Sequence, residues 1–64
     1  MYFNFNKYKK VVNDNIGDIA GLQLSEEVLN TFNPLIWNHH KKHNTPRNTA
    51  KTIVLEIVSQ YNNK

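Results

Sequence analysis

Three histidines lie close together in the segment HHKKH: His39, His40 and His43. Imidazole nitrogens are common metal ligands, and His39 and His43 have the spacing of two ligands on one face of a helix. A metal site needs at least a third ligand, and Lys41 and Lys42 place repelling positive charge between the histidines. We therefore expect a solvated helix end whose positive side chains complement the helix dipole, with no metal and no cofactor.

Residues with the chemistry of a catalytic centre are scarce in this chain. The sequence has no cysteine, which excludes a thiol nucleophile, disulfides and thiolate zinc sites. No serine lies in a nucleophile-elbow context, and neither glycine belongs to a phosphate-binding loop. A chain of 64 residues is also barely large enough to enclose a substrate pocket. We expect that the protein is not an enzyme.

Basic side chains gather in and after the histidine segment. Eight Lys and Arg residues against five Asp and Glu give a net charge of +3. That balance is compatible with nucleic acid, although phosphate and base recognition favour arginine and the chain has a single one. Free amides at a helix start after Thr45 would add to such a site. One expectation is a nucleic-acid interface made of Lys41, Lys42, Arg47 and Lys51.

Two stretches are similar to DNA-binding families. AGLQLSEEVLNTF followed by RNTAKTIVLEIVSQY resembles a ribbon-helix-helix repressor, with a strand, a helix that opens near Ser25 and a second amphipathic helix. Its departures are a long link between the helices, Pro34 within the first helix and Gly21 in the strand. The resemblance implies that strand side chains read bases, and the outward position offers only Gln23. IGDIAGLQLSEEVL also resembles a helix-turn-helix whose turn is about one residue short.

Apolar residues provide the other candidate surface. Trp37 and Leu55 lie off the apolar stripes of the helices expected around them. The N-terminus adds three aromatic residues. Several such residues on a small domain that lacks disulfides favour contact with another chain, either a partner protein or a second copy. The alternative is that the N-terminal aromatics complete the protein's own core. We expect partner binding through Trp37, Leu55, Tyr2, Phe3 and Phe5.

The element that follows the histidines is predicted to be a helix over 46–61. Thr45 is a favourable N-cap, and Pro46 occupies the first helical position. The apolar residues then recur at helical spacing and predict one buried face. The members of this stripe are Ala50, Ile53, Val54, Ile57, Val58 and Tyr61.

Two shorter helices are predicted before it, over 25–32 and 34–43. Ser25 is expected to cap the first, with Glu26 and Glu27 in the first turn where the helix dipole favours negative charge. Pro34 cannot sit deep within a helix without loss of a hydrogen bond, so we expect a break there. Asn33 and Pro34 together predict a second N-cap followed by a first-position proline.

The first quarter of the chain allows two interpretations. An apolar stripe that begins at Tyr8 predicts a weak helix over 8–20, after an extended arm over 1–8. Alternation of Phe3 and Phe5 with asparagines predicts strands instead, with a turn at Asn13–Asn15. The fold expected from these patterns is a single, mostly α domain (1–64) of three to four short helices with an aromatic N-terminal arm, which is coil or strand.

The broader setting follows from composition. The chain has no apolar run near the ~18 residues that a membrane span requires, so we expect a soluble, cytoplasmic protein. A chain this small has a marginal core, and self-association, as a dimer, is the expected support. Eleven Asn and seven Lys indicate an AT-rich genome, which is typical of phages and mobile elements. We expect a small protein-binding regulator or inhibitor; the alternative is a basic DNA-binding repressor.

Overall fold

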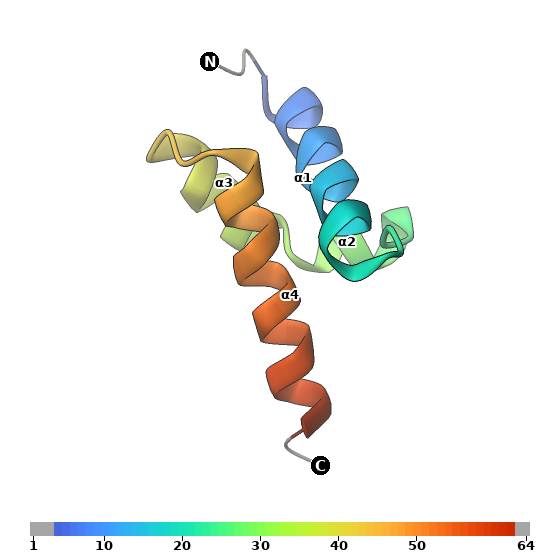
Figure 1. Ribbon diagram of the computed structural model, residues 1–64. Helices are drawn as coiled ribbons and strands as arrows, with labels where there is room; N and C mark the ends of the chain where they lie inside the picture. Colours follow the sequence, from blue (N-terminus) through green and yellow to red (C-terminus); the bar gives the residue numbers. More distant parts are fainter. Residues whose placement is uncertain (1–3, 63–64) are drawn as a thin grey trace.

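Four helices make up the computed structural model, which describes residues 4–62. They are α1 (Phe5–Ala20), α2 (Glu26–Thr31), α3 (Asn33–Lys41) and α4 (Pro46–Asn62) (Figure 1). The expectation of a small, mostly helical protein is confirmed, and residues 4–62 contain no strand. The largest helix–helix interface joins α1 and α4, which run in the same general direction.

The start of α1 corrects the expected arm over 1–8, because residues from Phe5 onward are helical rather than extended. Asn4 causes this early start. Its backbone is extended, and its side chain accepts a hydrogen bond of 2.8 Å from the amide of Lys7, which is N-capping geometry. The aromatic residues Tyr2 and Phe3 lie outside the described residues. Phe5 therefore belongs to the first turn of a helix and is half-buried.

The asparagines within α1 do not form the turn that the strand interpretation required. The side chain of Asn13 instead donates to the carbonyl of Leu24 (3.0 Å) and accepts from its amide (2.9 Å). These two bonds hold the connection between α1 and α2 against α1. α1 ends at Ala20 and is capped by Gly21, which adopts the left-handed conformation (φ 78°) and donates to the carbonyl of Gly17. The strand that the ribbon-helix-helix resemblance implied around Gln23 is not formed in these residues.

The break at Pro34 occurs as expected, but its details differ. Ser25 caps α2 as predicted, with its hydroxyl 3.3 Å from the amide of Val28. Phe32, not Asn33, is the residue between α2 and α3, and it provides no side-chain cap. Asn33 is already helical, and its amide oxygen accepts a hydrogen bond from Lys9 of α1 (2.9 Å). A tertiary contact therefore uses the side chain that the sequence pattern assigned to capping.

The end of α3 comes at Lys41, before the expected residue 43. His43 adopts a left-handed conformation with φ 59°. The amide of His43 donates to the carbonyl of His40 (3.1 Å), and that of Asn44 donates to the carbonyl of His39 (3.0 Å). This pair of bonds is the Schellman arrangement that closes helices, with histidine at the position that usually holds glycine.

The last helix, α4, begins as predicted, because the hydroxyl of Thr45 accepts from the amide of Asn48 (3.2 Å). Its apolar stripe is buried only at the start. Ala50 and Ile53 are fully buried, whereas Val58 and Tyr61 are 47% and 74% exposed. The C-terminal half of α4 extends beyond the other helices (Figure 1). No helix within residues 4–62 is long and apolar enough to cross a membrane.

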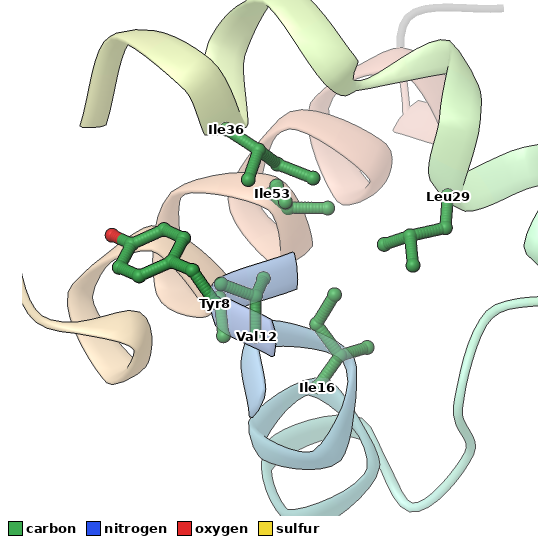
Figure 2. Packing of buried hydrophobic residues seen from close by; sticks show 7 residues of the cluster. Tyr8, Val12, Ile16, Leu29, Ile36 and Ile53 are labelled. Atoms are coloured by element: carbon green, nitrogen blue, oxygen red, sulfur yellow. The ribbon is translucent and has the colours of Figure 1, made fainter. Parts of the chain in front are cut away.

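The core lies between α1, α3 and the first half of α4. Side chains from these helices and from α2 converge on one cluster (Figure 2). Burial of each large aliphatic side chain contributes about 1.5–3 kcal/mol, which makes this cluster the main source of stability. Its members are Tyr8, Val12, Ile16, Leu29, Ile36, Ala50 and Ile53.

Candidate functional site

A buried polar network joins the start of α1 to the start of α4. The hydroxyl of Tyr8 lies 2.7 Å from that of Thr49, and both residues are almost fully buried. The Tyr8 hydroxyl also lies 2.7 Å from the carbonyl oxygen of Asn44, and the Thr49 hydroxyl lies 3.2 Å from that of Thr45. A buried hydroxyl without a partner destabilises the folded state, so these contacts explain how two polar groups occupy the core.

His39 of α3 completes the network, because its Nδ1 lies 3.0 Å from the Thr49 hydroxyl. Each hydrogen bond needs one proton between its two atoms. The network has four such contacts, and the hydroxyls of Tyr8 and Thr49 supply two protons. If Nδ1 of His39 carries a proton, three contacts are hydrogen bonds, and otherwise only two are. We therefore assign Nδ1 as the donor to Thr49. The Thr49 hydroxyl is buried and therefore out of reach of a substrate. Its contacts with Tyr8 and His39 connect α4 to α1 and α3.

Beside this network, aromatic rings surround His40. Its ring centroid lies 4.9 Å from that of Tyr8, 5.6 Å from that of Trp37 and 6.0 Å from that of Phe5. The rings of Phe5 and Trp37 meet edge to face at 5.3 Å. Such geometry is favourable beyond the burial of area alone. We call these four residues, with His39 and Thr49, the aromatic corner.

Trp37 is the part of the aromatic corner that reaches the surface, and 47% of this residue is exposed. The structure brings it together with Phe5, as a shared partner-binding surface requires. Leu55, which was expected in the same set, lies elsewhere: it is on α4, outside the aromatic corner, and 69% exposed. Tyr2 and Phe3 belong to the part of the chain that is not described.

Two lysines lie near the aromatic corner, one by the ring of Phe5 and one a helical turn after Trp37. Lys9 Nζ lies 5.6 Å from the ring centroid of Phe5 and donates to the side chain of Asn30 (2.6 Å) as well as to Asn33. Lys41 follows Trp37 by one helical turn on α3 and is exposed. An apolar surface with positive charge at its rim results.

The basic residues expected to bind nucleic acid divide into two groups. Arg47 and Lys51 are exposed and one turn apart on α4, and Arg47 donates to the side chain of Asn15 on α1 (3.3 Å). Lys41 and Lys42 belong to the end of α3 instead. α2 is six residues long, which is short for the recognition helix of a helix-turn-helix.

The histidines do not occupy one helix face. α3 ends before His43, so the one-turn spacing between His39 and His43 does not apply. His39 and His40 pack inward, and the Nδ1 of His40 is buried without a hydrogen-bond partner among residues 4–62. Within the same residues, no three His, Asp or Glu side chains lie close enough to hold a metal ion.

The roles of Thr49, His39 and His40 were missed at the sequence level. A signal was present, because Thr49 precedes Ala50 and lies one turn before Ile53 on the buried face of α4. His39 and His40 likewise follow Ile36 by three and four residues, which places them on the inner face of α3. A polar residue on a buried face needs a partner, and that rule predicts a network here.

Comparison with known proteins gives no further assignment. No family model matches the sequence, and neither a curated protein nor a solved structure matches it. Any function must therefore be argued from the geometry of the chain itself.

Proposed function

We propose that this chain is a small non-enzymatic protein that binds another protein and acts sterically on it. The observation that carries the proposal is the exposed edge of Trp37 in the aromatic corner. Tryptophan is the residue type most enriched among the side chains that dominate binding energy at interfaces. Burial of the Thr49 hydroxyl supports a structural role for the polar network.

The fixed position of Trp37 makes it a suitable anchor. The edge-to-face contact with Phe5 and the contact with His40 restrict its ring before any partner arrives. An anchor that is ordered in advance loses little conformational entropy on binding, about 0.5–1.5 kcal/mol less than a free side chain. The partner surface that fits is a groove able to accept an indole ring.

The charge around the aromatic corner favours an acidic partner. Lys41 lies one turn from Trp37, and the whole chain carries a net charge of +3. Positive charge at the rim of an interface accelerates association with a negative partner and contributes specificity more than affinity. The Asn- and Lys-rich composition supports a phage or mobile-element protein that inhibits a protein of its host or competitor.

A paired substitution tests the proposal. Immobilised wild-type protein is used to isolate candidate partners, and each purified candidate is titrated into wild type and variants by isothermal titration calorimetry, which does not depend on the fluorescence of Trp37, the single tryptophan. Trp37→Ala should weaken binding about 30-fold or more, because hot-spot residues contribute at least about 2 kcal/mol. Leu22→Ala is the matched control, since Leu22 is 75% exposed but lies outside the aromatic corner. Equal affinity of Trp37→Ala and wild type would contradict the proposal.

DNA binding remains the alternative, because Arg47 and Lys51 are exposed one turn apart at the start of α4. The test is a titration of an arbitrary duplex at several salt concentrations. Contact with about three phosphates gives a log–log salt slope near −3. Such a slope, abolished in the double variant Arg47→Ala, Lys51→Ala, would replace the protein-binding proposal. Absence of binding at low salt would remove the alternative.

A further inference from the structure

The C-terminal half of α4 carries an apolar stripe that its own fold covers only in part. Val54 and Ile57 are half-buried against the core, and Val58 and Tyr61 are 47% and 74% exposed. We call these four residues the α4 stripe. Figure 1 shows this half of the helix projecting past α1, α2 and α3. An apolar face of this kind marks a contact with another surface.

We propose that the α4 stripe binds the α4 stripe of a second copy of this chain, with the two helices antiparallel. The spacing of the four residues favours this occupant. Their positions follow i, i+3, i+4, i+7, and that pattern is unchanged when it is read in reverse. In an antiparallel pair, Val54 of one copy therefore faces Tyr61 of the other, and Ile57 faces Val58. A two-fold interface needs this self-complementarity.

The distribution of charge also favours a second copy over a charged partner. Glu56 is the only Asp, Glu, Lys or Arg between residues 54 and 62, whereas the chain as a whole carries +3. Two copies repel each other least where they meet through this half of α4. The antiparallel arrangement also directs the start of each α4, with Arg47 and Lys51, to opposite ends of the pair. The α4 stripe offers an acidic partner no positive charge.

The size of the stripe sets the strength of the association. Standard interfaces bury about 800 Å² on each partner, which is about one sixth of the 4658 Å² surface of this chain. The stripe spans eight residues, or about 12 Å of helix, and supplies less than that area. The pair therefore belongs to the weak class of interfaces, with a dissociation constant on the order of 10–100 μM. This inference does not rest on the proposed partner surface around Trp37.

Sedimentation equilibrium between about 10 μM and 1 mM tests for the pair. The wild-type mass should rise from 7.5 kDa towards twice that value, and more steeply when salt screens the net charge. Val58→Lys should keep the mass at 7.5 kDa across the range while circular dichroism stays helical. Leu55→Lys is the matched control, because it adds the same charge at an exposed position off the stripe. A constant wild-type mass, or equal loss in both variants, would overturn the proposal.

The antiparallel orientation of the two helices can be tested by disulfide cross-linking. The chain lacks cysteine, so introduced cysteines can pair only with each other. A Val54→Cys chain and a Tyr61→Cys chain are mixed at about 500 μM and oxidised gently, and the disulfide-linked species are separated by mass. The antiparallel pair should give mostly the mixed product. Excess of the two symmetric products would mean parallel helices and would overturn the arrangement. The salt dependence separates this inference from the partner proposal, since salt should weaken binding to an acidic partner.

Discussion

The two halves of α4 differ in how their apolar and polar residues are used. In the first half, Thr49, Ala50 and Ile53 are fully buried, and even the hydroxyl of Thr49 has partners on α1 and α3. In the second half, the stripe residues Val58 and Tyr61 are 47% and 74% exposed. The sequence pattern of the helix is similarly apolar throughout. The comparison teaches that a continuous stripe on one helix can serve two purposes, namely the internal core and an external contact.

The largest effect should come from a cavity in the buried half. Ile53→Ala removes a fully buried side chain and should destabilise the protein by about 2–5 kcal/mol, which is most of the stability of a domain this small. Val58→Ala, five residues later, should change the free energy of unfolding by less than about 0.5 kcal/mol. Urea unfolding followed by circular dichroism, at a concentration below 10 μM, measures both. Similar losses would show that the two halves do not differ.

The polar network should give the next largest effect. Thr49→Val keeps the shape of the side chain but removes the hydroxyl, which leaves His39 Nδ1 and the Tyr8 hydroxyl with fewer partners. We expect a loss of about 1–3 kcal/mol, the typical cost of buried groups left unsatisfied. Thr52→Val is the control, because among residues 4–62 the Thr52 hydroxyl bonds only within its own helix, to the carbonyl of Asn48 (3.0 Å). Equal losses in the two unfolding curves would assign no special role to the network.

A smaller effect should come from the turn before α4. His43 has φ 59° in a position where glycine is favoured. His43→Gly should therefore stabilise the protein by about 0.5–1 kcal/mol, or about 2–8 °C in melting temperature. Gly21→Ala provides the reciprocal case, because Gly21 also has positive φ (78°) and open space around it. That variant should lose a similar amount. A lower melting temperature for His43→Gly would contradict the expected strain.

Val58→Lys should change the stability of the monomer least and the formation of the dimer most. Val58→Lys replaces a half-exposed residue, so the free energy of unfolding at low concentration should change by less than about 0.5 kcal/mol. At about 500 μM, the wild type should unfold at a higher temperature than this variant, since only the wild type gains from dimer formation. Scanning calorimetry at both concentrations measures this difference. A concentration-independent melting temperature for the wild type would argue against an external contact on α4.

Signals between residues close in the sequence predicted where helices begin better than they predicted the tertiary contacts of those helices. Ser25 and Thr45 cap α2 and α4 because capping depends on residues three positions apart in the chain. Asn33 failed as a cap because Lys9, 24 residues earlier, binds its side chain. The candidate site shows the same limit. Trp37 was predicted to lie off the apolar stripe of its helix and is 47% exposed, but its contact with Phe5 depends on how α1 and α3 pack.

The sequence also did not predict how far along α4 the core extends. Helical periodicity indicates which face of α4 is apolar, and it does not indicate how far the neighbouring helices reach along that face. Val58 and Tyr61 fit the pattern as well as Ile53 does. Their exposure follows from the lengths and crossing of α1 and α2, which are properties of the whole fold.

The bond between Tyr8 and Thr49 joins residues 41 positions apart, and it belongs to the interface between the first and last helices. Closing a loop of that length carries an entropic cost before any contact is gained, and non-local contacts slow folding. α1 buries Tyr8, Val12 and Ile16 mainly against α4, the last helix to be synthesised. Folding should therefore be all-or-none and slower than in helical proteins whose neighbouring helices pair in order. A ribosome must therefore extend the nascent chain past Ile53 before the largest interface of the fold can form.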